Sequence, residues 1–247
     1  MNPSFDLDKI KYATDQPTYG KAVDLYESSK VTQVEEGIGS CSAVVIGTNP
    51  YHVSVEVRRF GLGYCDCYLG QRDTLCKHIV ALSIYAVMDG KGLSGEDKKQ
   101  VGSPVCSERL GELSEKELVE TKKAITLTMK YIKPYNGPSR IWFSYQNSLS
   151  EGCARLAKLV SDLPVSEQSS KLLVNLLLRL DKKLRTGGVD DSNGTVGGFM
   201  EESVLVLKNY VKLDQDCIKV LKKLCGRETC FGWEESLIRI VDEASDE

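Results

Sequence analysis

The chain lacks the marks of several protein classes. Histidine occurs only twice among 247 residues, and no apolar run is long enough to form a membrane-spanning helix. No basic excess is present either, since 32 lysines and arginines face 35 aspartates and glutamates for a net charge of -3. A dedicated nucleic-acid binder usually carries such an excess, so strong nonspecific binding through bulk charge is disfavoured. We therefore expect no membrane partner and no basic tail.

The first residues of the chain also predict no secretory leader. Residues 1–6 contain no charged segment that is followed by an apolar stretch. The nine cysteines are an odd number, which fits reduced thiols better than a disulfide framework. We therefore expect a reducing, cytoplasmic location. A hydrophobic content of 41% and a charged content of 27% are typical of a globular protein, and the length suits one large or two modest domains.

What the sequence does contain is a compact set of metal-binding residue types. Cys65, Cys67, Cys76 and His78 form the pattern Cys-x-Cys, eight residues, Cys-x-His. Three thiolates and one imidazole fill a tetrahedral Zn²⁺ shell, which is the closed coordination of a structural site. We predict one structural zinc ion here. The alternative is a group of unrelated free thiols in a cysteine-rich chain.

With these four residues, the segment 43–85 resembles a SWIM-type zinc finger, whose pattern is Cys-x-Cys, a variable loop and Cys-x-His. The runs 42–48 and 51–57 match the two short strands of that family, and 76–82 matches its first helical turn. Members occur in chromatin-remodelling ATPases, transposase-related proteins, ubiquitin ligases and recombination factors. The resemblance covers under a fifth of the chain. It implies zinc binding with DNA or protein contacts, and it implies no activity.

The residues around the motif predict the same small module. Apolar residues alternate with polar ones over 51–58, as in a half-buried strand, and the preceding turn residues 48–50 favour a hairpin. The run 79–88 after the last ligand is almost wholly apolar, so it is expected to be a buried helix. A hairpin, a metal knuckle and a packed helix therefore make up the predicted finger.

The fold class expected for the whole chain is α+β, with the zinc module followed by a mostly helical domain. The expected parts are a lead-in that packs on the finger (1–39, with a strand at 31–35), the finger (40–89), a linker (90–104) and an all-α domain (105–247). The pattern Ser-x-x-Glu at 114 and 148 indicates capping boxes for helices that end near 133 and 163. Leucines at helical spacing predict a third helix over 172–184, and three more are expected at 199–212, 214–225 and 232–244.

Two kinds of binding surface are open from sequence. Nucleic acid, DNA above all, can contact cations near the motif, with help from lysine-bearing helices. Alternatively, the finger is a protein-interaction adaptor that uses an edge strand or an aromatic loop near residue 142. That loop can stack bases, grip a peptide, or simply bury its aromatic rings. The candidate binding residues are Arg58, Arg59, Arg72, Lys77, Arg140 and Trp142.

An enzyme is not expected from this sequence. Four protein ligands close a zinc site, whereas a catalytic zinc keeps an open position. Only His52 remains for acid–base work, and no catalytic motif or small-molecule site is evident. A second cysteine group, Cys217, Cys225 and Cys230, lacks a histidine and would need a distant fourth ligand such as Cys153. We expect reduced, partly buried thiols there.

Overall fold

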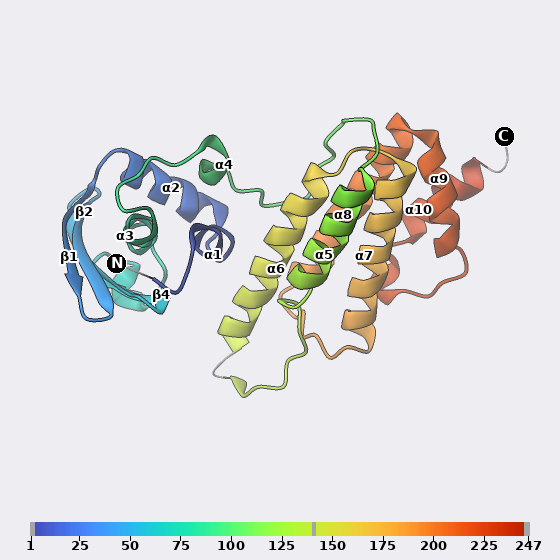
Figure 1. The fold of residues 1–247 in the computed structure, drawn as a ribbon. Helices are drawn as coiled ribbons and strands as arrows, with labels where there is room; N and C mark the ends of the chain where they lie inside the picture. Colours follow the sequence, from blue (N-terminus) through green and yellow to red (C-terminus); the bar gives the residue numbers. More distant parts are fainter. Residues whose placement is uncertain (1–2, 140–141, 245–247) are drawn as a thin grey trace. The chain divides into compact units, whose positions relative to one another are not determined.

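The computed structural model describes residues 3–139 and 142–244, and the chain divides into two compact units, residues 1–100 and 101–247. The first unit contains a four-stranded antiparallel sheet with helices, and the second is built from helices (Figure 1). The predicted α+β class is confirmed.

The sheet of the first unit is a simple meander in the order β1-β2-β3-β4. The expected hairpin is present, with Cys41 opposite Val55 and Val45 opposite Tyr51 in adjacent antiparallel strands. A strand was also expected near 31–35. The strands are β1 (Val31–Gly37), β2 (Ser40–Ile46), β3 (Pro50–Glu56) and β4 (Arg59–Cys65).

The fourth strand, β4, was not predicted from the sequence. It reads Arg-Phe-Gly-Leu-Gly-Tyr-Cys, and two glycines weaken the strand signal. Gly63 is required there, because an added Cβ would lie 2.8 Å from Ile79 Cγ2 and 2.7 Å from the Ser54 carbonyl oxygen. This strand leads the chain directly into the metal-binding motif.

Helices cover one face of the sheet, and the central one is α3 (Lys77–Met88), which contacts all four strands. It is apolar nearly all round because it is packed on several sides, against α2 (Gln16–Glu27) as well as the sheet. Asp6 and Asp15 cap α1 (Leu7–Tyr12) and α2 through their side chains. The ligand cysteines belong to the same buried core as these helices.

The segment after α3 continues to bind the first unit. Tyr26 donates its hydroxyl hydrogen to the Lys91 carbonyl oxygen at 2.6 Å, and Leu93 is buried in the core. The short helix α4 (Gly95–Lys98) adds a salt bridge of 2.5 Å between Lys98 and Glu27. Residues 91–100 of the segment expected as a linker are therefore held against this unit.

The second unit packs its helices around a leucine-rich core. Its helices are α5 (Glu115–Thr128), α6 (Trp142–Asp162), α7 (Glu167–Arg185), α8 (Thr195–Leu213), α9 (Ile218–Leu221) and α10 (Glu235–Glu243). Short 3-10 turns lie at Gln215–Cys217, Lys222–Leu224 and Cys230–Gly232. The predicted helix over 214–225 is thus broken into three pieces. Within the described residues, no helix is both long and apolar enough to cross a membrane.

Two predicted helix boundaries in this unit were wrong, the end of one helix and the start of the next. The Ser114 capping box does open α5, but that helix ends at Thr128 rather than near 133. The second box does not open a helix, because α6 already begins at Trp142. Ser148 lies inside α6, and its hydroxyl donates to the Tyr131 carbonyl oxygen at 3.0 Å. The side chain thus satisfies the turn after α5 instead of capping a helix.

We predict that Leu177→Ala destabilises the second unit by about 2–5 kcal/mol, because it removes a fully buried side chain and leaves a cavity. Leu205→Ala is the matched control, since that leucine is 57% exposed on α8. Urea unfolding followed by circular dichroism measures both. Equal stabilities for the two variants would contradict this description of the core.

Candidate metal centre

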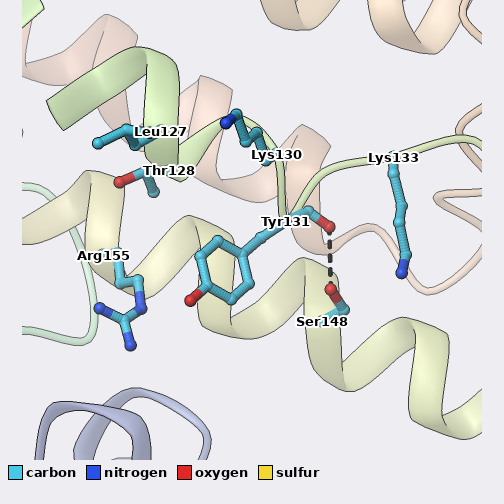
Figure 2. A pocket seen from close by; sticks show the side chains of 7 residues that line it. All are labelled: Leu127, Thr128, Lys130, Tyr131, Lys133, Ser148 and Arg155. Atoms are coloured by element: carbon cyan, nitrogen blue, oxygen red, sulfur yellow. Dashed lines mark hydrogen bonds between the residues drawn. The ribbon is translucent and has the colours of Figure 1, made fainter. Parts of the chain in front are cut away.

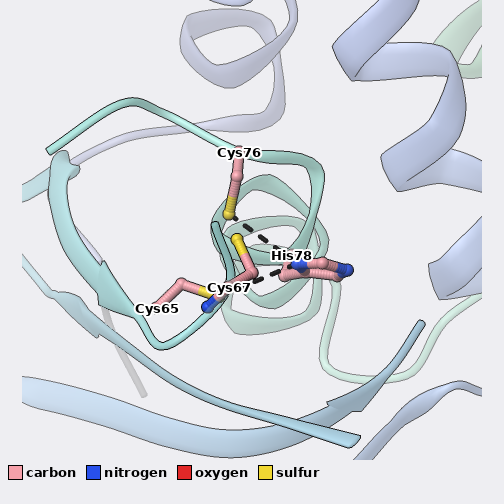
Figure 3. Close-up of side chains that lie close together, drawn as sticks. All are labelled: Cys65, Cys67, Cys76 and His78. Atoms are coloured by element: carbon pink, nitrogen blue, oxygen red, sulfur yellow. Dashed lines mark hydrogen bonds between the residues drawn. The ribbon is translucent and has the colours of Figure 1, made fainter. Parts of the chain in front are cut away.

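The four predicted ligands converge at the junction between the sheet and α3. Cys65 is the last residue of β4, and Cys67 follows on the next turn. Cys76 is the N-cap of α3, and His78 lies in its first turn. All four are buried, and their ligand atoms lie within 4.8 Å of one another. Figure 3 shows the sulfurs and the imidazole gathered around one point.

The spacing of these atoms suits a tetrahedral metal ion. His78 Nδ1 lies 3.7 Å from Cys65 Sγ and 3.8 Å from Cys76 Sγ. A tetrahedral shell with metal–sulfur distances of about 2.3 Å and a metal–nitrogen distance of about 2.0 Å separates sulfur from nitrogen by about 3.5 Å. The cluster can therefore hold one metal ion with little movement, and it is compatible with a zinc finger.

Backbone donors and neighbouring thiols act on the protonation of these cysteines. The backbone N–H groups of Cys67 and Gly70 donate to Cys65 Sγ at 3.5 Å and to Cys67 Sγ at 3.4 Å. The hydrogen bond from Cys65 lowers the pKa of the Cys76 thiol, although burial opposes this shift. The same hydrogen bond, together with burial, raises the pKa of the Cys65 thiol. A metal ion binds both as thiolates.

Two glycines make room for the ligands. At Gly70, an added Cβ would lie 2.2 Å from the Cys65 carbonyl oxygen. At Gly47, it would lie 2.7 Å from His78 Nε2, a buried nitrogen with no hydrogen-bond partner. The ring of Tyr51 stacks on the same imidazole at 4.4 Å and fixes its plane. The need for glycine at these two positions could not be predicted from the sequence, because the contacts form only in the folded chain.

The second histidine is engaged away from the ligand cluster. His52 Nδ1 lies 3.1 Å from Asp66 Oδ2, and the His52 backbone N–H donates to Asp66 Oδ1 at 3.1 Å. This clasp ties the turn between Cys65 and Cys67 to β3. The His52 side chain is 79% exposed. The clasp therefore positions the metal-binding turn from outside, which sequence reasoning missed.

Two of the predicted cations, Arg72 and Lys77, lie between Cys67 and His78 in the sequence, and Arg58 and Arg59 lie at the turn between β3 and β4. Arg58, Arg59 and Arg72 are exposed, and none of them forms a salt bridge to a described residue. Lys77 is half-buried in the first turn of α3. We give the name knuckle rim to the exposed cations, tyrosines and leucines of residues 58–72: Arg58, Arg59, Leu62, Tyr64, Tyr68, Leu69 and Arg72.

The remaining candidates lie in the second unit. Arg140 falls outside the described residues. Trp142 begins α6, and its indole N–H donates to Asp190 Oδ2 at 3.0 Å. The indole is therefore bound to the loop before α8, which is a structural contact.

The second cysteine group does not gather into a metal site. Cys217 is buried and Cys225 is exposed, while the half-buried Cys230 donates its thiol hydrogen to Asp181 Oδ1 at 3.0 Å. Burial, and then Asp181, raise the pKa of Cys230 to about 12. Over the described ranges, the only such cluster of cysteine, histidine and carboxylate ligands is the one at Cys65.

A hollow of about 570 Å³ lies between the end of α5 and the middle of α6. Its lining includes three cations, Lys130, Lys133 and Arg155 (Figure 2). Arg155 is held by Glu151 at 3.0 Å, and the ammonium groups of the two lysines point in different directions. The charges do not converge, so the hollow is not a built anion site.

Comparisons with family models, curated proteins and solved structures found no match for this chain. The SWIM-type resemblance therefore remains a prediction that depends on the ligand pattern and its neighbouring strands. The geometry itself establishes a buried Cys₃His cluster at the start of a packed helix.

We predict that Gly70→Ala weakens metal binding and lowers the melting temperature of the first unit, because the new methyl group collides with the Cys65 carbonyl. Gly61→Ala is the control, since nothing lies within 4 Å of the Cβ it would add. A competition titration with a zinc chelator measures the affinity of each variant. Unchanged affinity in Gly70→Ala would contradict the described approach of the two segments.

Proposed function

We propose that the cluster binds one structural zinc ion and that the zinc-held module contacts nucleic acid, DNA above all. Zinc is favoured because a tetrahedral set of three thiolates and one imidazole is typical of its structural sites. Four protein ligands fill the tetrahedral shell, so no coordination position is left for a substrate. This supports a binding role rather than catalysis. The assignment of zinc rests on the ligand geometry. The assignment of nucleic acid rests on the cations beside it.

The observation that carries the nucleic-acid proposal is the unpaired state of the arginines at the knuckle rim. Some cations elsewhere are neutralised by carboxylates, as in Lys158 with Asp162 at 2.7 Å and Lys219 with Asp216 at 2.7 Å. Arg58 and Arg59 lie together at the turn between β3 and β4, free of such partners. Free guanidinium groups are suited to phosphate oxygens.

Charge is also distributed unevenly within the first unit. Residues 56–77 carry four lysines and arginines against three carboxylates, whereas the rest of 1–100 carries seven against ten. The stretch around the metal is therefore the basic part of an acidic unit. A local contact with nucleic acid through these few cations needs no overall basic charge. The small number of cations limits the number of phosphates bound, so the affinity should fall only modestly as salt rises.

An adaptor function is the second candidate, and one observation favours it. β4 is at the end of the sheet, so one of its edges is unpaired, and Leu62 within this strand is 63% exposed. An extended peptide could pair with such an edge. Absence of nucleic-acid binding at low salt would leave this candidate as the better one.

We predict that the purified protein carries one zinc per chain and that Cys67→Ser unfolds the first unit while the second unit keeps its helical signal. Structural zinc contributes about 10 kcal/mol or more, which is as large as the usual stability of a whole domain. The two units have separate cores, so the second does not need the metal. Metal analysis and circular dichroism measure both effects. Cys225→Ser, at an exposed cysteine, should change neither.

Retention of zinc and of a native melting transition by Cys67→Ser would contradict the structural-site assignment. Unfolding of both units by the same substitution would contradict their independence. Treatment of the wild-type protein with a strong chelator should reproduce the effect of Cys67→Ser, because both remove the same constraint.

We predict that zinc-loaded protein binds DNA with an affinity that falls as salt rises, and that Arg58→Ala/Arg59→Ala flattens the log–log salt slope by about two units. The control is Lys21→Ala/Lys30→Ala, which removes the same charge from exposed positions of the same unit. Fluorescence anisotropy across a salt series gives the slopes. Equal losses in the two double variants would mean that binding follows net charge and not the knuckle rim.

A further inference from the structure

Aromatic rings stand exposed beside the free arginines of the knuckle rim. Tyr64 is 57% exposed and Tyr68 is 67% exposed. Tyr19 and Tyr26 of the same unit are buried in its core, whereas these two rings remain in contact with water. Their exposure next to unpaired cations therefore points to a ligand with both planar and anionic parts.

The ring of Tyr64 stands on the open face of the sheet. Position 63 faces α3, because a Cβ there would touch Ile79, and Cys65 is buried on the same side. Successive side chains of a strand point to opposite faces, so Tyr64 points away from α3. Its partner across the sheet is Ser54, a small residue that leaves the ring uncovered.

The ring of Tyr68 is fixed in place by a cation. The guanidinium carbon of Arg72 lies 4.1 Å from the centre of the ring, which is a close cation–π contact. Arg72 covers one face of the ring, and the large exposed fraction of Tyr68 leaves the other face open. The pair therefore offers a flat surface with a positive charge at its back.

Building on the nucleic-acid role proposed above, we propose that the knuckle rim selects single-stranded nucleic acid. Bases stack on Tyr64 and Tyr68, while Arg58 and Arg59 contact phosphates. A duplex hides the faces of its bases in its own stack, so only a single strand can use these rings. The two tyrosines are four residues apart, which limits their separation to about 14 Å, within the length of a short strand.

Carboxylates near Tyr64 and Tyr68 in the sequence do not block access to the two rings. Asp66 lies between the tyrosines in the sequence, but both of its carboxylate oxygens accept hydrogen bonds from His52. Its charge is therefore turned toward β3. Glu56 and Asp73 are exposed on the same stretch and reduce its net charge, while both rings remain more than half exposed.

The test compares a single-stranded oligonucleotide with a duplex of the same sequence, using the full zinc-loaded chain and fluorescence anisotropy. We expect the single strand to bind more tightly. Tyr64→Ala and Tyr68→Ala should each weaken single-strand binding by roughly 5- to 150-fold, the range measured for loss of one stacked base, and should change duplex binding far less. Tyr64→Phe and Tyr68→Phe keep the ring and should restore wild-type binding.

The control is Phe231→Ala, which removes an aromatic ring that is 54% exposed in the second unit and should leave binding unchanged. Zinc content is checked for every variant. If Tyr68→Ala loses zinc, Tyr64→Ala alone decides the question, because its ring stands on the open face and contributes nothing to the core.

The two proposals fail in different ways. Equal binding of single strand and duplex, unaffected by either tyrosine substitution but reduced by Arg58→Ala/Arg59→Ala, would overturn the single-strand inference and leave the nucleic-acid role standing. No binding of either form at low salt would overturn both.

Discussion

The constraint on which the first unit depends is the meeting of four ligand atoms at one point between β4 and α3. The two cysteines at the end of the strand and the Cys–His pair at the start of the helix approach within 4.8 Å of one another. Because α3 contacts every strand, fixing its first turn fixes the position of the whole helix on the sheet. A single ion would therefore hold together a unit whose apolar core alone is small.

The same constraint determines which surface is left for binding. The turn between Cys65 and Cys67 has a backbone N–H directed at sulfur and its aspartate held by His52. Tyr68 and Arg72 follow this turn, and the Arg72 guanidinium stacks on the exposed Tyr68 ring. A rigid backbone behind an exposed ring and a free charge is the arrangement that lets a short segment bind a partner with little loss of conformational freedom.

The sequence predicted the features that depend on local pattern. Ligand spacing predicted the buried Cys₃His cluster, and alternation of apolar residues predicted the hairpin before it. It missed β4, because Gly61 and Gly63 weaken the strand pattern, and the need for Gly63 appears only when α3 packs against it. It also placed the start of α6 too late, because Ser148 bonds to the turn at Tyr131 and not to its own helix. These features depend on distant segments, which spacing in one sequence does not reveal.

The most direct test is X-ray absorption at the zinc edge of the purified chain. We predict one zinc per chain, with three sulfur neighbours at about 2.3 Å and one nitrogen neighbour at about 2.0 Å. That shell would establish that Cys65, Cys67, Cys76 and His78 act together as ligands. A shell of oxygen and nitrogen alone, or protein that folds fully without any metal, would contradict it.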